Sequence, residues 1–351
     1  MTDRIEELQA PSQSHPDFYT AYAFTERGGA LTKITVSWRD PKAGQVVVKV
    51  IACGVCGSDE QVPNGVYPVQ YPRIPGHEIV GDVVAIPPSE TRWKLGDRVG
   101  GGWHGGHCHS CSRCRVGDFM TCENEDINGI LRDGGYAEYA TLRTEAVVSV
   151  PKDIDPSEAA PLLCAGITVF NSLRHMDVLP PDVVAVQGIG GLGHIALQVA
   201  RGMGFRAVAL SSGESKKELA HQLGAHEYID GSKVDQAAAL KKLGGAKVIM
   251  CTAPNAKVIE NLLPGLAVDG TLLLLALEET PITISPMSMV ASRLSIRGWV
   301  CGHAGDSEDM LTFAKAHDVK VMVEKFPLDK APEAYDHRSS ARFRAVIVPG
   351  L

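Results

Sequence analysis

A glycine-rich turn between two short apolar runs is the feature that most constrains how this chain can fold. Residues 183–186 (VVAV) form an apolar, β-branched run, which is typical of a strand buried on both faces of a parallel sheet. The run leads into GIGGLG at 188–193, and residues 194–203 then carry apolar side chains at helical spacing. Gly204 ends this helix, and residues 207–210 predict the next strand. The stretch therefore predicts a strand–turn–helix–strand (βαβ) unit.

The glycines of this turn indicate a dinucleotide site. They permit a tight turn, a close approach of backbone N–H groups to a pyrophosphate, and close packing of the helix on the strand. The helix N-terminus then faces the phosphates with its partial positive charge. The glycine pattern alone is weak evidence, but the flanking strand and helix are both predicted here. We therefore expect the cofactor to lie against Gly188, Gly190, Gly191, Leu192 and Gly193.

Charge and cysteine content exclude several classes of function. The net charge of −7, without any basic block, argues against a nucleic-acid partner. The first residues, MTDRIEELQAPSQSHPD, lack an apolar run, so we predict no signal peptide, and no 18-residue apolar stretch predicts a membrane span. Nine cysteines without an export signal indicate a reducing compartment, where clustered cysteines are more often metal ligands than disulfides. We expect a cytoplasmic enzyme.

The distribution of strand and helix signals predicts two kinds of domain. Residues 1–20 are expected to be a loose polar extension, followed by short strands up to about residue 150, best at 34–36, 45–51, 79–86 and 136–141. From 157 to about 300, helix and strand alternate, with strands at 248–252 and 271–276 and helices at 216–223 and 234–243. A helix at 307–316 and strands at 319–323 and 344–348 end the chain. A β-rich domain and a doubly wound α/β domain with a parallel sheet follow from this pattern.

Four cysteines predict a structural metal site. Cys108, Cys111, Cys114 and Cys122 have the spacing C-x2-C-x2-C-x7-C in a polar, glycine-rich loop. Four thiolates wrapped by one short loop close a tetrahedral shell and leave no position for a substrate. Four free thiols or a disulfide framework would be the alternative, and the reducing compartment argues against it. An iron–sulfur cluster also takes four thiolates, and the spacing does not exclude it. We favour zinc.

A second set of candidate ligands is scattered along the chain. Cys56 lies in CGVCGSD, His77 in GHE, and Cys164 in LCAGIT. Each residue alone has a structural explanation, since a lone cysteine is usually a small buried hydrophobe. Together they supply two thiolates and an imidazole, the set of three ligands that leaves zinc an open fourth position. Sequence separation alone does not bring them together.

These motifs, in this order, resemble those of the zinc-containing medium-chain alcohol dehydrogenases, in particular the cinnamyl-alcohol and broad-specificity microbial branch. The resemblance runs from about residue 22 to the C-terminus and rests on CGVCGSD, GHEIVGDV, GDRVG, the four cysteines, CAGIT and GIGGLG. It implies a Rossmann domain inserted in a β-rich, GroES-like catalytic domain. The expected domains are residues 1–165, 166–302 and a return to the catalytic domain at 303–351.

The resemblance also implies roles for individual residues. Catalytic zinc would be held by Cys56, His77 and Cys164, with Glu78 as a nearby or transient ligand, and a second zinc by the four loop cysteines. Asp59 would orient the histidine ligand. Thr168 and Arg344 would contact the cofactor. The remaining three cysteines, at 53, 251 and 301, match no ligand position, and we expect them to pack in the core.

The implied reaction is hydride transfer between a carbinol carbon and a nicotinamide, with zinc acting as a Lewis acid. Ser58 matches the hydroxyl that accepts the alcohol proton and passes it toward the cofactor ribose. The histidine usual three residues further on is replaced by Gln61. An amide cannot act as a base near pH 7, so the proton must leave through water or directly.

The choice of cofactor depends on the turn after the second predicted strand. NAD-binding sites carry an acidic residue there, which holds the ribose 2′-hydroxyl. This chain has SSGESKK at 211–217, and Ser211, Ser212 and Lys216 can donate to a 2′-phosphate. Alternatively, the lysines belong to a solvated helical turn, and Glu214 accommodates NAD. We predict that NADP(H) is preferred and that NAD(H) is possible.

The predicted activity is that of an NAD(P)-dependent alcohol dehydrogenase (EC 1.1.1.-) acting on a primary aromatic or aliphatic alcohol, or on the aldehyde in reverse. Tyr67, Trp103 and Phe119 are candidate pocket aromatics, although each can equally be core. One alternative is a zinc-dependent polyol or formaldehyde-adduct dehydrogenase; a non-catalytic dinucleotide-binding sensor is another, and it would predict a broken ligand set. The family also implies a homo-oligomer, either a dimer or a tetramer.

Overall fold

The computed structural model describes residues 14–351, which divide into two compact units. Among these residues, unit 1 comprises 14–164, 302–311 and 322–351, and unit 2 comprises 165–301 and 312–321. We had placed the whole of 303–351 in the catalytic domain, whereas 312–321 belongs to unit 2, because the second half of helix α9 (Ala304–Ala316) packs there. Phe313 of this helix contacts Phe170, with ring centroids 5.1 Å apart.

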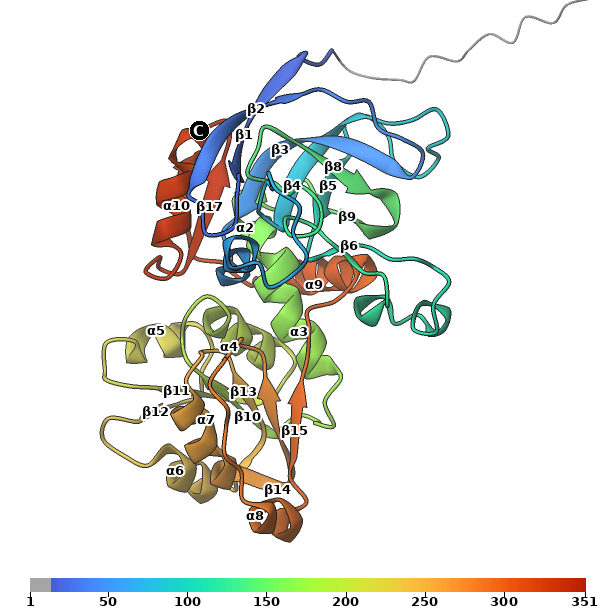
Figure 1. Cartoon of the computed structure of the whole chain (residues 1–351). Helices are drawn as coiled ribbons and strands as arrows, with labels where there is room; N and C mark the ends of the chain where they lie inside the picture. The colour runs from blue at the N-terminus through green and yellow to red at the C-terminus, as the bar shows by residue number, and fades with distance from the viewer. Residues whose placement is uncertain (1–13) are drawn as a thin grey trace, which may run out of the picture. The chain divides into compact units, whose positions relative to one another are not determined.

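Unit 1 is built mainly of antiparallel strands (Figure 1). Its largest sheet has the order β16-β17-β3-β4-β5-β9, with β8 paired to β3. The strands of unit 1 are β1 (Phe18–Phe24), β2 (Leu31–Ser37), β3 (Gln45–Gly54), β4 (Glu78–Ala85), β5 (Arg98–Gly101), β6 (His104–Gly106), β7 (Asp126–Ile127), β8 (Tyr139–Arg143), β9 (Val147–Ser149), β16 (Val323–Pro327) and β17 (Arg344–Val348). Its helices are α1 (Gln61–Asn64), α2 (Pro156–Pro161) and α10 (Ala331–His337).

Unit 2 is a doubly wound α/β domain, as predicted. Its six parallel strands have the order β12-β11-β10-β13-β14-β15, so the chain starts in the middle and reverses direction next to β10. The strands are β10 (Val183–Gln187), β11 (Arg206–Ser211), β12 (Glu227–Asp230), β13 (Ala246–Cys251), β14 (Leu266–Leu274) and β15 (Ser295–Gly298). The helices are α3 (Ile167–Arg174), α4 (Gly193–Gly202), α5 (Lys217–Gln222), α6 (Gln236–Lys242), α7 (Ala256–Leu262) and α8 (Pro286–Ser292).

Burial of apolar side chains explains why these segments form. Ala185, Val208 and Ile249 of the central strands are buried and pack against Leu240 of α6 and Ile259 of α7. Such β-branched strands are covered on both faces because helices pack on both sides of a parallel sheet. Within residues 14–351, no helix is both long and apolar enough to cross a membrane.

Three predicted segments differ from the structure. The loose extension expected over 1–20 ends earlier, because β1 begins at Phe18 and pairs with β2; residues 1–13 lie outside the described part of the chain. The strand expected at 319–323 instead begins at Val323, where its pairing with β17 starts. The strand expected at 136–141 begins at Tyr139, because the backbone of Tyr136 bonds to Tyr22 and Pro75 and not to β3.

Candidate active site

The register of β3 against β4 brings two of the scattered ligands together in unit 1. These strands are antiparallel, and Gly54 at the end of β3 pairs with Glu78 at the start of β4. Cys56 follows β3 by two residues and His77 immediately precedes β4, so both lie at the same end of the ladder. Cys164 arrives from a π-helical turn, Leu162–Gly166, that follows α2. Such turns are frequent at functional sites.

The ligand atoms of Cys56, His77, Glu78 and Cys164 all lie within 4.8 Å of one another. The two sulfur atoms of Cys56 and Cys164 are 3.8 Å apart. His77 is fully buried, and its Nε2 has no hydrogen-bond partner among the described residues. A buried ring nitrogen without a partner is costly unless a ligand engages it. Two thiols, an imidazole and a nearby carboxylate are the donors that zinc prefers, so these residues fit a zinc ion.

Asp59 holds the histidine in place from behind. Its Oδ1 is 3.0 Å from Nδ1 of His77, while Oδ2 accepts hydrogen bonds from the Cys56 amide at 3.0 Å and the Tyr136 hydroxyl at 2.7 Å. A carboxylate on Nδ1 favours the tautomer that leaves Nε2 free to bind a metal. Tyr136 was not predicted, because nothing near it in the sequence links it to a residue 77 positions away.

The charges of the cluster are suited to a cation. Burial disfavours a charge on His77, but Asp59 and Cys56 outweigh it and raise the pKa of the imidazole. A hydrogen bond from Cys164 lowers the pKa of the Cys56 thiol well below its usual range, even though burial opposes this. Burial raises the pKa of Glu78 to about 7, against the opposing charge of Arg344. The cluster therefore favours a thiolate at Cys56, and a thiolate is a preferred ligand of zinc.

Glu78 is bonded to an arginine that we had predicted to contact the cofactor. Arg344 of β17 is buried and donates from a terminal guanidinium nitrogen to Oε1 of Glu78, whereas Oε2 has no partner among the described residues. Gly54 makes room for this carboxylate, because a Cβ there would lie 1.8 Å from Oε2. The sequence did not reveal this ion pair, and the cofactor contact of Arg344 stays a prediction.

The four cysteines of the loop also converge. Cys122 Sγ lies 3.6 Å from Cys108 Sγ and 3.9 Å from Cys111 Sγ, and Cys108 Sγ lies 4.0 Å from Cys114 Sγ. Backbone amides point at the sulfurs, for example from Cys111 to Cys108 at 3.4 Å. The amide and hydroxyl of Ser110 and the Cys111 amide lower the pKa of Cys108 to about 5. Burial raises the pKa of Cys114 to about 12, so the metal-free cluster favours thiolates at only some of its four positions. The four converging sulfurs fit a closed tetrahedral metal site.

The other predicted residues of unit 1 fall into two groups. Ser58 is half-buried and its amide donates to Cys56 Sγ at 3.4 Å, and the edge of Trp103 meets His77 at a centroid distance of 5.0 Å. Tyr67 lies 6.4 Å from Trp103, so both aromatics are close to the candidate metal cluster. Phe119 lies elsewhere, stacked on His107 at 4.0 Å. The three remaining cysteines are buried, as expected for core residues.

The predicted glycine turn of unit 2 has the conformation that a phosphate-binding turn requires. Gly188 has a φ of +87°, which side chains disfavour, and a Cβ on Gly193 would lie 1.9 Å from the Gly188 carbonyl oxygen. A Cβ on Gly190 would meet nothing within 4 Å, which leaves the backbone open there. Gly191 and Leu192 complete the turn before α4, and Thr168 is buried in α3.

The turn after β11 is tied to the glycine turn and to its neighbouring loop. Ser211 ends β11, and Lys216 reaches back to donate to the Ile189 carbonyl at 2.8 Å. Glu214 forms an ion pair with Lys233, from the loop after β12. Lys233 was not predicted, because it lies 19 residues further along the chain.

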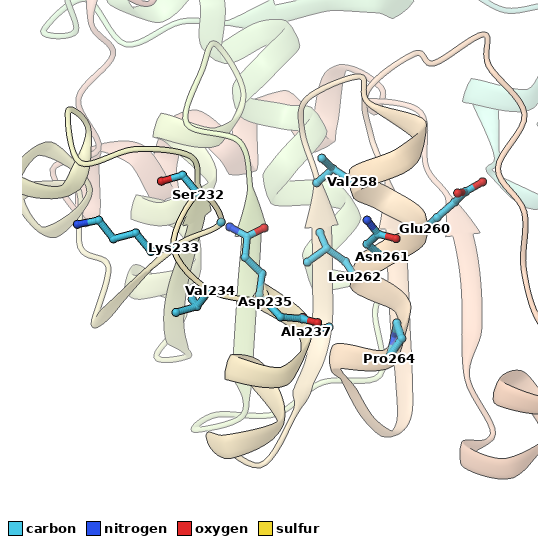
Figure 2. Close-up of a pocket in the computed structure, with 12 residues that line it drawn as sticks. Ser232, Lys233, Val234, Asp235, Ala237, Val258, Glu260, Asn261, Leu262 and Pro264 are labelled. Carbon is cyan, nitrogen blue, oxygen red and sulfur yellow. The ribbon is translucent and has the colours of Figure 1, made fainter.

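A groove of about 760 Å³ begins beside this loop and is lined by polar and apolar residues. Figure 2 shows Ser232 and Lys233 on the side opposite to Val258 and Asn261, which come from α7. The loop is joined to the end of β11 by a hydrogen bond from the Gly231 amide to the Ser211 carbonyl, 2.8 Å long. The groove therefore lies next to the turn at 211–217, which we expect to distinguish NADP(H) from NAD(H).

Comparisons with known proteins agree with these features. Residues 42–152 match the model of the alcohol dehydrogenase GroES-like domain, and residues 191–316 match that of zinc-binding dehydrogenases. Alcohol dehydrogenase patD of Penicillium expansum is 48% identical, with 95% of this chain and 98% of that protein covered. A probable cinnamyl alcohol dehydrogenase of Populus deltoides is 34% identical, with 93% and 94% covered. The solved cinnamyl alcohol dehydrogenase of Sorghum bicolor superimposes with a TM-score of 0.84 at 28% identity, with 94% and 97% covered. The chain therefore belongs to the zinc-containing medium-chain alcohol dehydrogenase family.

Proposed function

We propose that this enzyme oxidises primary alcohols, aromatic or aliphatic, and reduces the corresponding aldehydes, with NADP(H) as its preferred cofactor. The observation that carries the proposal is the convergence of Cys56, His77 and Cys164, with Asp59 behind the histidine. The names of the Penicillium and Populus relatives support the class of substrate. The intact ligand set argues against a non-catalytic sensor.

Two zinc ions fit the chain, one held by Cys56, His77 and Cys164 and one by the four loop cysteines. The first would supply Lewis-acid stabilisation of an alkoxide or polarisation of a carbonyl. Asp59 orients the imidazole of His77. Trp103 packs against this imidazole, and Tyr67 packs against Trp103. The Ser58 hydroxyl is the group of this chain that can receive the alcohol proton. Because Gln61 cannot be protonated near pH 7, the proton leaves through water or directly.

The preference for NADP(H) rests on the turn at 211–217. Ser211 stands at the end of β11, where an acidic residue would hold a ribose 2′-hydroxyl. Ser211, Ser212 and the nearby Lys216 supply hydroxyl and ammonium donors instead, which suit a phosphate.

A substrate panel tests the proposal directly. Aromatic and aliphatic aldehydes, with a polyol and a formaldehyde adduct as comparison, are assayed with NADPH and NADH separately. We expect turnover of the aldehydes, with a higher kcat/KM for NADPH. Turnover of the polyol or the adduct alone would overturn the substrate class, and metal-loaded protein without any turnover would favour the sensor.

The variant Ser211→Asp tests the reading of the cofactor turn. A carboxylate there repels a 2′-phosphate and accepts hydrogen bonds from a free hydroxyl. The charge repulsion amounts to about 1–4 kcal/mol at short range in a partly wet site. It should lower the ratio of kcat/KM for NADPH to kcat/KM for NADH by roughly tenfold to several-hundredfold. A wild type that already prefers NADH, or a ratio that does not move, would remove the basis for the NADP(H) proposal.

We also propose that the enzyme is a cytoplasmic homo-oligomer. The clustered free cysteines suit a reducing compartment. In unit 2, β15 is an edge strand among the described residues, and the nearby Leu277, Met287 and Val290 are 71–79% exposed. An edge strand flanked by exposed apolar side chains favours pairing with a second copy across a two-fold axis.

A further inference from the structure

The turn that we expect to face the 2′-phosphate contains a carboxylate that ought to repel it. Glu214 is the only acidic residue in the stretch SSGESKK at 211–217. Its side chain is 64% exposed, and it follows Ser211, Ser212 and Gly213 directly. A carboxylate in this turn would oppose a 2′-phosphate bound against the same turn, even in a wet site. A chain that binds NADP(H) therefore needs something that cancels this charge.

The loop after β12 supplies a cation to that carboxylate. Lys233 forms an ion pair with Glu214 and, by donating a hydrogen bond, lowers the pKa of the carboxyl, so Glu214 is ionised at neutral pH. Figure 2 shows the Lys233 side chain extended away from α7. Lys216 donates one hydrogen bond to the Ile189 carbonyl of the glycine turn at 2.8 Å, and Lys217 acts on Glu214 only through its charge.

Shared hydrogen bonds join the turn that carries Glu214 to the loop that carries Lys233, so the backbone on both sides of this ion pair is positioned. Ser211 and Asp230 are register partners at the ends of β11 and β12. One oxygen of the largely buried Asp230 accepts from the Gly213 amide at 2.7 Å and from the Ser232 amide at 2.9 Å. Asp230 thus joins the turn that carries Glu214 to the loop that carries Lys233 and holds the backbone on both sides of the ion pair.

We propose that Lys233 is a specificity-determining residue for the cofactor, and that it acts by neutralising Glu214 beside the ribose 2′ position. This inference rests on the proposed preference for NADP(H) and names the residue that makes this preference compatible with Glu214. Removing the Lys233 charge leaves the carboxylate uncompensated, which disfavours a 2′-phosphate and leaves a free 2′-hydroxyl nearly unaffected. Removing both charges restores the binding of the phosphate.

The test measures binding without turnover. Isothermal titration of the zinc-loaded enzyme with adenosine 2′,5′-bisphosphate and with 5′-AMP gives the contribution of the 2′-phosphate as the ratio of the two Kd values. The variants are Lys233→Met, Glu214→Gln and the double variant, with Lys242→Met as a control of equal charge change on α6. NADPH and NADH are titrated in parallel.

We expect Lys233→Met to weaken the bisphosphate by about threefold to tenfold and 5′-AMP by less than about twofold, from screened Coulomb interactions over several ångströms. In the Glu214→Gln background the same substitution should have almost no effect. An equal loss in that background would mean that Lys233 contacts the phosphate itself and would overturn the mechanism proposed here.

Four further outcomes are decisive. If Lys242→Met matches Lys233→Met, the effect is one of net charge and the inference fails. Equal weakening of both ligands would assign Lys233 a structural role only. If the wild type shows no preference for the 2′-phosphate, the NADP(H) proposal itself fails, whereas a wild-type preference that Lys233→Met leaves unchanged overturns only the role of Lys233.

Discussion

At the scale of single residues, Asp59 connects more of the candidate active site than any ligand does. Its two oxygens reach the His77 ring, the Cys56 amide and the Tyr136 hydroxyl, so one buried carboxylate fixes two candidate ligands at once. A buried carboxylate is tolerated because donors surround it and because a cation is expected on the far side of the imidazole. Asp59 therefore helps to position two of the candidate metal ligands without being one of them.

The ligand role of Cys164 gives the first prediction. In Cys164→Ala we expect turnover to vanish and the bound zinc to fall from two ions to one, because the catalytic site loses one of its three ligands. We expect the fold to be retained. Zinc content, circular dichroism and kcat are measured together. The matched control is Cys251→Ala, a buried cysteine outside both clusters, which should keep two zinc ions. Near wild-type activity in Cys164→Ala would mean that the ligand assignment is wrong.

At the scale of elements, the cysteine loop and the glycine turn differ in what stabilises them. The loop over residues 108–122 has little regular structure of its own, only short 3₁₀ turns at Cys114–Val116 and Phe119–Thr121. A metal that joins its four sulfurs would replace the stabilisation that a helix or sheet would otherwise give. The glycine turn needs no metal, because α4 and β10 hold it from both ends.

A prediction for the loop follows. Cys111→Ser should lower the melting temperature and remove one zinc ion, while any remaining folded protein keeps its catalytic chemistry, because a closed site holds a loop and not a substrate. Differential scanning calorimetry and zinc analysis provide the measurement. Ser112→Ala, at the adjacent exposed position, serves as the control. Unchanged melting temperature and zinc content in Cys111→Ser would contradict the structural role of the site.

The glycine turn allows a comparison of two matched substitutions. Gly193→Ala puts a methyl group 1.9 Å from a backbone oxygen, so we expect a loss of stability of about 1–3 kcal/mol and weaker cofactor binding. Gly190→Ala meets no atom and should leave the melting temperature nearly unchanged. Should Gly190→Ala still weaken NADPH binding, the cofactor itself approaches this backbone. Equal stability of the two variants would contradict the steric argument.

At the scale of the whole molecule, the C-terminal segment completes the unit that the N-terminal segment begins. Strand β17 pairs with β3 and carries Arg344 to Glu78, which lies 266 residues earlier. Unit 2 is inserted between these parts of the chain, and its edge strand β15 follows α8, which carries the exposed Met287 and Val290. Assembly through unit 2 would leave the sheet of unit 1 intact.

Assembly gives the last prediction. Light scattering after size exclusion should give at least twice the chain mass of 37.5 kDa. The pair Met287→Glu and Val290→Glu, which places charges on the exposed face of α8, should reduce this to the monomer mass. Leu179→Glu, an equally exposed apolar position in unit 2, is the control. A monomeric wild type, or an assembly that survives the double substitution, would refute the proposed interface.

The sequence by itself determined the features that depend on local order along the chain. The βαβ unit is predicted because the glycines and the apolar spacing lie within thirty residues, and the strand order of unit 2 agrees with it. The cysteine loop was visible for the same reason, since its four thiols are separated by a few residues. The resemblance to a family supplied the grouping of Cys56, His77 and Cys164, which their spacing did not.

Only the tertiary structure decided the contacts that join distant segments. The pairs Tyr136–Asp59, Arg344–Glu78 and Lys233–Glu214 link residues 77, 266 and 19 positions apart, and no periodicity in the sequence encodes them. Arg344 and Glu78 belong to strands of one sheet, on either side of β3, whereas the other four residues lie in turns or loops that only the packing of the chain brings together. The boundary of unit 2 was misplaced at 312–321 for a similar reason, since a helical pattern shows which face is apolar but not which core covers it.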